Sequence, residues 1–212
     1  LRAKDLNSAI GRVYTLETIG AIIGGFVLAY ILIPCLSSFQ TGFIISFLNL
    51  ILSAALLPGK RIKYFAVLLI SLVFSLVFTP LTTYLQSDTI KKQWRGYEVL
   101  DYNNSNYANI AVTKKLGQYT FFYNGLPLIT TPFPDKQFTV EFANFPLLFH
   151  RAPARVLIAA SGVGGLITEV LKHPIERLDY VEIDPLTIKM LKKYPTPLSE
   201  AEFSDKRVSI IN

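Results

Sequence analysis

A glycine-rich segment and a later acidic residue form the part of this sequence that could do chemistry. Residues 161–165 read SGVGG and directly follow an apolar run. Glycines let a backbone approach a ligand without a Cβ in the way, and the start of a following helix favours polar or negative groups. Glu182 ends the next apolar run, where a carboxylate can accept hydrogen bonds from both hydroxyls of a ribose. The pattern indicates a nucleoside site, with Gly162, Gly164, Gly165 and Glu182 as its candidate binding residues.

Alternating strands and helices must position these residues. The continuous apolar run at 156–160 is typical of a buried parallel strand, and helical patterns follow at 166–172 and 187–193. Strand-like runs at 178–181 and 207–211 complete a β-α-β-α-β order, the first half of a doubly wound sheet. We therefore expect residues 136–212 to form a Rossmann-like domain of the S-adenosylmethionine-methyltransferase type, truncated after its third strand. The alternative interpretation is an ordinary turn, with Glu182 solvated at a strand end.

A smaller β region precedes that domain. Short runs of β-formers at 97–100, 107–113, 119–123 and 126–131 predict four strands, and Asn124-Gly125 is a strong tight-turn signal. Residues 97–135 are therefore expected to form an antiparallel β-subdomain. A short helix at 139–150 should follow, with its apolar residues on one face; these are Phe142, Phe145 and Leu148.

The N-terminal part of the chain is apolar and nearly free of charge. Residues 1–85 carry eight of the 36 charged side chains, and six of these eight are basic. Three uncharged runs predict transmembrane helices near residues 19–36, 41–57 and 64–82, so residues 1–85 form the transmembrane region. Residues 86–96, with basic side chains and Trp94, are expected to be a juxtamembrane linker.

The expected localisation is therefore an integral, multi-pass membrane protein. The basic loop at 60–63 and the basic residues before the first helix prefer the cytoplasmic side, which would put the soluble part outside after three crossings. The same rule favours the cytoplasmic side for the start of the soluble part, because it carries three basic residues, Lys91, Lys92 and Arg95. A nucleoside ligand is cytosolic, so we expect the soluble part in the cytoplasm.

Composition excludes several other functions. The single cysteine, Cys35, lies in an apolar run, and the two histidines occupy unrelated contexts, so neither a disulfide framework nor a metal site is expected. The net charge of +6 comes mostly from the apolar part, which argues for basic loops beside a lipid bilayer and against nucleic acid as a partner. The first residue is not methionine and the last strand-like run ends the chain, so we expect a fragment of a longer polypeptide.

The glycine segment resembles that of a known family. Residues 156–174 (VLIAASGVGGLITEVLKHP) and 180–185 (YVEIDP) are similar to the glycine loop and ribose-binding strand of the spermidine and spermine synthases, the polyamine aminopropyltransferases. Further landmarks of that family occur in the same order at 105–112, 124–125 and 144–148. The apolar part, with GRVY at 11–14 leading into Ile19-Gly20-Ala21, resembles the membrane-fused members.

The resemblance implies a donor and a reaction. The family transfers an aminopropyl group from decarboxylated S-adenosylmethionine to a polyamine, without a metal, and pocket carboxylates assist loss of the proton from the attacking amine. Glu182 matches the ribose-binding acid, and Gly162, Gly164 and Gly165 match the loop. Val163 stands where the family has the aspartate that holds the cationic arm of the donor, and valine cannot bind an ammonium group. The family's catalytic aspartate would lie beyond Asn212, so the catalytic residues stay unknown.

Other family positions that contact the substrates also differ here: Ala108 and Leu128 stand where the family has glutamine, and Phe138 where it has tyrosine. Three functions therefore stay open. The first is a membrane-bound aminopropyltransferase-like protein that binds decarboxylated S-adenosylmethionine, with a polyamine substrate. The second is a methyltransferase that uses S-adenosylmethionine. The third is a non-catalytic nucleoside-binding or structural domain on a transporter-like membrane module. A homodimer is a further open expectation.

Overall fold

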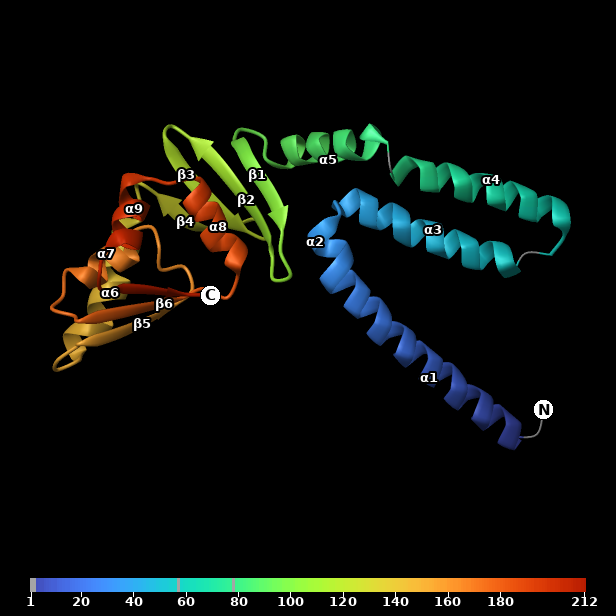
Figure 1. Ribbon diagram of the computed structural model, residues 1–212, viewed down its shortest axis with the longest axis horizontal. Coiled ribbons are helices and arrows are strands. Elements are labelled where there is room, and N and C mark those ends of the chain that lie inside the picture. Colours follow the sequence, from blue (N-terminus) through green and yellow to red (C-terminus); the bar gives the residue numbers. More distant parts are fainter. Residues whose placement is uncertain (1–2, 57, 78) are drawn as a thin grey trace. The chain divides into compact units, whose positions relative to one another are not determined.

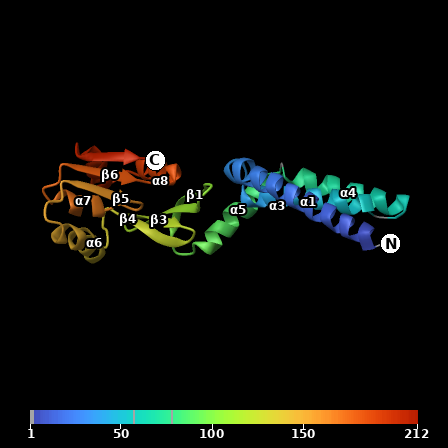
Figure 2. The same cartoon turned by 90° about the horizontal axis from the view of Figure 1, so that it is seen from below.

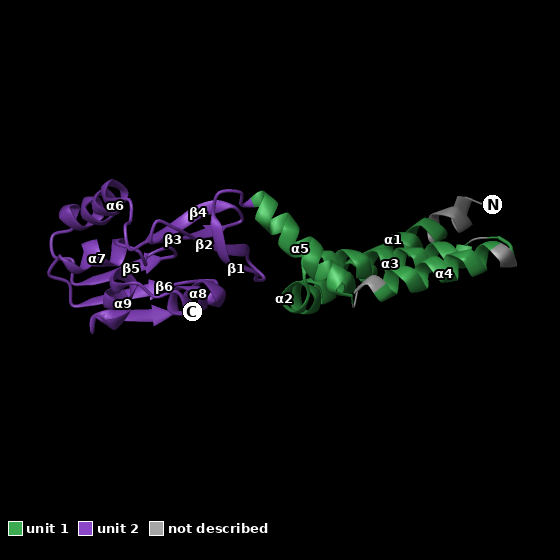
Figure 3. Cartoon of the chain, turned by 90° about the horizontal axis from the view of Figure 1, so that it is seen from above, with its two compact units in different colours: residues 1–93 green, residues 94–212 purple. Residues whose placement is uncertain are grey.

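The structure is a computed structural model that describes residues 3–56, 58–77 and 79–212. It divides into two compact units, Leu1–Gln93 and Trp94–Asn212 (Figure 3). The first unit is helical. Its elements are α1 (Ala3–Val27), the π-helical turn η1 (Leu28–Leu32), α2 (Ile33–Cys35), α3 (Ser38–Leu56), α4 (Lys60–Val77) and α5 (Pro80–Gln93) (Figure 1).

Two stretches of this unit have the length and composition of a membrane span. They are Ala9–Cys35, with a mean hydropathy of 2.1, and Ser38–Leu56, with a mean hydropathy of 1.7. No residue of either apolar window is buried inside the protein. A third candidate arises if the bent pair Ile62–Ser75 and Pro80–Gln93 counts as one span. The helices occur where the apolar runs at 19–36 and 41–57 predicted them, although residue 57 lies outside the described residues.

The third predicted helix, at 64–82, is corrected by the structure. The chain is helical up to Val77 in α4 and again from Pro80 in α5, and the two helices meet at an angle of 63°. Pro80 explains the break. A proline lacks the N–H that a continuous helix needs, and its ring collides with the preceding turn, whereas the first turn of a new helix accommodates it. Residue 78, within the predicted run, lies outside the described residues.

The expected linker at 86–96 is also shorter than predicted. Helix α5 continues to Gln93, and only the last few residues before β1 are non-helical. Lys92 forms a 2.8 Å ion pair with Asp88 one helical turn earlier, and such a pair supports an exposed helix. Trp94 begins the second unit, where its ring packs edge to face on Phe122 with the centroids 4.5 Å apart. The basic segment is therefore mostly helix.

A four-stranded antiparallel sheet opens the second unit, as predicted. Its strands are β1 (Glu98–Asn104), β2 (Asn109–Lys115), β3 (Gln118–Tyr123) and β4 (Leu126–Thr131), in the order β1-β2-β3-β4. Asn124 and Gly125 both have positive φ, 49° and 82°, which a tight two-residue hairpin turn requires. The β-subdomain therefore follows from its local sequence.

The α/β part follows the sheet. Its elements are α6 (Lys136–Phe149), β5 (Arg155–Ala159), α7 (Leu166–Leu171), β6 (Arg177–Val181), α8 (Pro185–Lys193), α9 (Pro197–Ser204) and β7 (Val208–Ile211). The three strands are parallel, in the order β5-β6-β7. Helix α6 lies on the β5 side of this sheet, away from β7 (Figure 2). The predicted β-α-β-α-β order is confirmed, and α9 is an additional helix that was not among the predicted elements.

The burial of α6 and β5 does not follow from their apolar patterns alone. The predicted apolar face of α6 is exposed; its residues are Phe142, Phe145 and Leu148. The buried face of α6 carries Thr139, Ala143 and Leu147. Strand β5 was expected to be fully buried, yet Leu157 is 67% exposed. Among the described residues β5 pairs only with β6. An apolar pattern gives the presence of an element, but which side is covered depends on its neighbours.

Candidate functional site

The glycine loop lies between the end of β5 and the start of α7, and all of its glycines are buried. Gly164 and Gly165 have φ of 96° and 113°, values that side chains rarely allow. A Cβ on Gly162 would lie 2.9 Å from Ile158, and one on Gly165 would lie 2.8 Å from Pro134. The glycines are therefore required by close contact within the protein itself, and these contacts fix the shape of the loop.

The two residues before the loop glycines also have an unusual backbone. Ala160 and Ser161 have φ of 64° and 52°, in the left-handed region that favours glycine. Ala160 is exposed, and its N–H donates a 2.8 Å hydrogen bond to the carbonyl of Val181 on the neighbouring strand. This turn directs the backbone of Ser161 toward the end of β6.

Glu182 meets the glycine loop at that point. Its side chain is only 4% exposed, and Oε2 accepts a 2.7 Å hydrogen bond from the hydroxyl of Tyr180. The backbone N–H of Ser161 donates a longer bond of 3.4 Å to the same oxygen. The structure thus brings Glu182 beside the loop, as the sequence predicted. This burial does not agree with a Glu182 side chain that is solvated at a strand end.

Tyr180 holds Glu182 from the interior. Its ring is fully buried and would contact any Cβ added at Gly162, so loop, ring and carboxylate are packed together. Burial, with the negative charge of Glu182, raises the pKa of the Tyr180 hydroxyl, which keeps it a proton donor. The sequence pattern predicts only that Tyr180 is a strand residue. Its spacing of two from Glu182, on the same strand face, is the signal that identifies it as the partner of that carboxylate.

Asp184 is a second buried carboxylate, 1% exposed, two residues farther on. It caps α8 by accepting a 2.9 Å bond from the N–H of Leu186. It also accepts 2.6 Å bonds from the hydroxyls of Ser105 and Tyr123, which belong to the β-subdomain. Burial, and then the bond to Asp184, raise the pKa of Tyr123. Asp184 therefore ties the β-subdomain to the α/β part at the end of β6.

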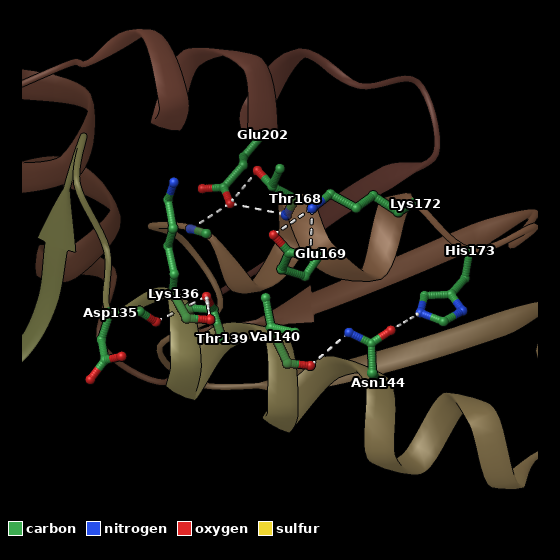
Figure 4. A network of polar contacts seen from close by, with 11 residues as sticks. Asp135, Lys136, Thr139, Val140, Asn144, Thr168, Glu169, Lys172, His173 and Glu202 are labelled. Carbon is green, nitrogen blue, oxygen red and sulfur yellow. Dashed lines mark hydrogen bonds and ion pairs between the residues drawn. The ribbon is translucent and has the colours of Figure 1, made fainter.

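Glu202 is a third buried carboxylate, and no sequence motif indicates it. It projects from α9 to the far end of the glycine loop, where it accepts bonds from the N–H groups of Gly164 at 2.7 Å and Gly165 at 2.8 Å. Thr168 donates to it from both its N–H, at 3.1 Å, and its hydroxyl, at 2.9 Å (Figure 4). Burial raises the pKa of Glu202, and the hydrogen bonds from the loop oppose part of that rise.

Val163 lies in the middle of the loop and is 2% exposed. Its side chain belongs to the hydrophobic core, together with Ile158, Leu166 and Tyr180. The resemblance assigns this position to the acid that holds the cationic arm of the donor. In this chain the position supplies an apolar side chain to the core instead.

An apolar cavity of about 450 Å³ adjoins the loop between α6, β5 and α7. Ser161 is its one hydroxyl-bearing lining residue. The others are Phe138, Phe142, Ala143, Pro146, Leu147, Val156, Leu157, Ile158, Ala159, Ala160, Leu166 and Val170. None of the predicted binding residues lines it, so the cavity and the carboxylates are distinct features that meet at Ser161. Within the described residues, no group of three or more His, Cys, Asp or Glu side chains is placed to hold a metal ion.

A parallel β-α-β-α-β unit with a glycine loop and a buried acid at the end of its second strand defines a Rossmann-like domain. Comparison with known proteins shows what it is similar to: residues 137–212 match the model of the spermine/spermidine synthase domain. The resemblance predicted from the loop and the strand is confirmed.

The relatives are enzymes of that family. Polyamine aminopropyltransferase 2 of Aquifex aeolicus is 24% identical over 99% of this chain and 43% of its own length. The polyamine aminopropyltransferase of Thermoanaerobacter sp. is 32% identical over 59% of this chain and 46% of its own length. The solved spermidine synthase of Thermotoga maritima is 30% identical, with a TM-score of 0.45, over 54% of this chain and 40% of the other. The chain thus spans less than half the length of these relatives.

Proposed function

We propose that this chain is a membrane-bound, spermidine synthase-like protein whose C-terminal unit binds the nucleoside of an S-adenosylmethionine-type donor. The observation that carries the proposal is the meeting of Glu182 Oε2 with the backbone N–H of Ser161, 3.4 Å apart. It puts a carboxylate that can accept the ribose hydroxyls directly beside the glycine loop. A spermidine synthase solved with the transition-state analogue AdoDATO supports decarboxylated S-adenosylmethionine as the donor class.

The polyamine half of the reaction has less support. The aminopropyl arm of the donor is cationic, and Val163 offers it a buried apolar side chain in place of an acid. A second candidate, favoured by this one observation, is a domain that binds the nucleoside without transferring the aminopropyl group. The methyltransferase, the second function left open by the sequence, would use the same glycine loop and Glu182, and no other residue in the described part of the chain favours it.

Calorimetry on the full chain in detergent separates these candidates. Binding of methylthioadenosine, the nucleoside without the aminopropyl arm, supports the nucleoside site. Decarboxylated S-adenosylmethionine should bind with nearly the same affinity because no acid at position 163 holds its ammonium group. A preference of about tenfold or more for this donor, which corresponds to about 1.4 kcal/mol, would mean that another carboxylate binds the arm. Absence of binding for both compounds would refute the proposed function.

The membrane part of the proposal rests on exposed apolar surface. Side chains such as Ile22, Leu52 and Phe65 are between 65% and 74% exposed, which a lipid bilayer would accommodate and water would not. We place the C-terminal unit in the cytoplasm, where the nucleoside donor is found. Helices α4 and α5 would then form one broken span or a re-entrant pair.

Single cysteines test this topology, since Cys35→Ser removes the one native thiol. In that background, Lys63→Cys lies at the start of α4 and Lys115→Cys lies in the β-subdomain. A membrane-impermeant maleimide applied to intact cells should label Lys63→Cys and Lys115→Cys differently if α4 and α5 together cross the bilayer. Equal labelling indicates a re-entrant pair. Protection of Lys115→Cys in intact cells and its labelling after permeabilisation support the cytoplasmic placement, and the reverse contradicts it.

A further inference from the structure

One buried carboxylate of the protein itself accepts hydrogen bonds from the backbone N–H groups of the glycine loop. Glu202 accepts four bonds of 2.7 to 3.1 Å, from the N–H groups of Gly164 and Gly165 and from the N–H and hydroxyl of Thr168. Figure 4 shows Thr168 and Glu202 with the two bonds between them. In dinucleotide-binding proteins the donors of such a loop face a phosphate of the ligand. In this chain they face a side chain of the protein itself.

The placement of Glu202 is built into the fold. Helix α9 begins with Thr196, whose side chain accepts a bond from Ser199 N–H in a capping box, followed by a proline at the first helical position. The hydroxyls of Thr196 and Thr131 lie 2.5 Å apart, which ties the start of α9 to β4. Glu202 is 1% exposed, and in the described part of the chain no lysine or arginine forms an ion pair with it.

We propose that Glu202 is a specificity-determining residue of the nucleoside site, which positions the glycine loop and excludes nucleosides that carry a phosphate or carboxylate next to the loop. The inference rests on the proposed function and narrows it to donors without an anionic tail. Two effects act together. The loop amides are already satisfied, so an incoming anion gains no hydrogen bond from them. The buried charge of Glu202 also repels an anion at short range in a poorly screened environment.

This assignment separates the candidate donors by charge. Decarboxylated S-adenosylmethionine and methylthioadenosine have no anionic group, whereas intact S-adenosylmethionine has a carboxylate and adenosine 5′-monophosphate has a phosphate. A site that Glu202 shapes should accept the first two and reject the last two. Intact S-adenosylmethionine is therefore the informative ligand, since the methyltransferase alternative needs it to bind.

The test is a calorimetric comparison of wild type, Glu202→Gln and Glu200→Gln in the full detergent-solubilised chain. Glu200 is the matched control because it lies on the same helix and is exposed. Wild type and Glu200→Gln should bind methylthioadenosine at least about tenfold more tightly than adenosine 5′-monophosphate or S-adenosylmethionine. Glu202→Gln, which keeps the shape but loses the charge, should bind methylthioadenosine about tenfold more weakly and discriminate less. Folded Glu202→Gln with wild-type affinities for all three ligands overturns the proposal.

A second measurement does not depend on nucleoside binding. Glu202→Ala leaves four donors without a partner, and formate is a carboxylate small enough to replace the lost group. Sodium formate should raise the unfolding temperature of Glu202→Ala above its value in sodium chloride of equal ionic strength, and should not do so for Glu200→Ala. No formate effect overturns the positioning role. A third outcome is that formate stabilises Glu202→Ala while the wild-type protein binds no methylthioadenosine. That result would refute the proposed nucleoside function, and with it the role of Glu202 in ligand selectivity. The positioning of the loop by a carboxylate would still be supported.

Discussion

The hydroxyl of Tyr180 lies 2.7 Å from Oε2 of Glu182, so a fully buried tyrosine fixes the carboxylate that the proposed site needs. The two residues are two positions apart on β6 and share one face of the strand. The remaining bonds to Glu182, from Ser161 and Asp184, are both 3.4 Å long. The carboxylate is therefore held mainly on its inner side by one strong donor.

Glu182→Gln should weaken nucleoside binding. The amide keeps an acceptor for Tyr180 but loses the charge and brings donors where ribose hydroxyls need acceptors. Each charge-assisted bond contributes about 1.5–3 kcal/mol, so the affinity should fall by roughly tenfold to a few hundredfold, with stability changed by about 1 kcal/mol or less. Calorimetry with methylthioadenosine and urea denaturation measure the two effects. Glu176→Gln, an exposed acid just before β6, is the control, and equal affinities for the two variants would remove Glu182 from the site.

Tyr180→Phe, in contrast to Glu182→Gln, should lower the stability of the protein more than its affinity for the nucleoside. It leaves the buried Glu182 carboxylate with only its two long hydrogen bonds, and a buried group that loses its partner costs about 1–3 kcal/mol. The free energy of unfolding should fall by that amount in urea denaturation of the full chain. A stability equal to wild type would mean that water or another side chain replaces the hydroxyl.

Val163→Asp distinguishes a core position from a ligand position. Val163 is 2% exposed and packs in the hydrophobic core, so a carboxylate there would be buried without a partner. We expect destabilisation by about 2 kcal/mol or more and no gain in affinity for decarboxylated S-adenosylmethionine. Val163→Ala, which only removes two methyl groups, should cost less. A stable Val163→Asp variant with increased affinity for this donor would show that the loop turns position 163 toward the ligand.

Ala160→Gly should stabilise the protein. A left-handed backbone costs a non-glycine residue about 1–2 kcal/mol, and the greater freedom of glycine in the unfolded chain offsets about 0.5–1 kcal/mol of the gain. The net increase in the free energy of unfolding should be about 1 kcal/mol or less, measured by urea denaturation. Ala152→Gly is the control, since Ala152 is exposed and has no positive φ, and it should be neutral or destabilising. Destabilisation by Ala160→Gly would mean that the methyl group makes a contact that outweighs the strain.

The contact of β1 with α8 should weaken in acid. Partial burial raises the pKa of Asp101, but bonds from Lys193, Asn103 and Tyr194 outweigh it and hold the pKa below its ordinary value of 3.8. A depressed pKa means that the stabilisation is present above pH 3.8 and is lost as the pH falls through the folded-state value. Because the groups are partly exposed, Asp101→Asn should cost about 1 kcal/mol or less at neutral pH. Urea denaturation against pH should show the two proteins converging below that window, and a constant difference would contradict the assignment.

Local sequence signals predicted most of the fold of the second unit. Asn124-Gly125 marked the hairpin, and the strand–glycine–helix pattern at 156–172 marked the parallel part, because turn chemistry and periodicity act over a few residues. The side of α6 that packs inward was not predictable in this way. Phe142 and Phe145 are more apolar than Thr139 and Ala143, yet the smaller residues are the buried ones on a helix that packs against α7.

The residues of the candidate site also fall into those that the local sequence predicts and those that only tertiary packing brings to the site. Glu182 and the glycines were found because one β-α-β unit supplies both within a short stretch. Glu202 approaches the loop from α9, 37 residues after Gly165, and no local pattern connects them. The signal for α9 itself was available in Thr196-Pro197, a capping residue followed by proline at the first helical position. What that helix carries to the loop depends on tertiary packing.

The π-helical turn at Leu28–Leu32 changes how the first long helix must be counted. The N–H of Ile33 donates to the carbonyl of Leu28, five residues earlier, so this turn holds one more residue than an α-helical turn. One extra residue rotates every later side chain by about 100° around the axis. Gly20 and Gly24 lie about one helical turn apart on α1, so a partner helix that packs against them would meet a different set of side chains after Leu32. Cross-linking or tryptophan scanning along this helix should show a break in phase at that turn, and one continuous heptad register would misassign the residues beyond it.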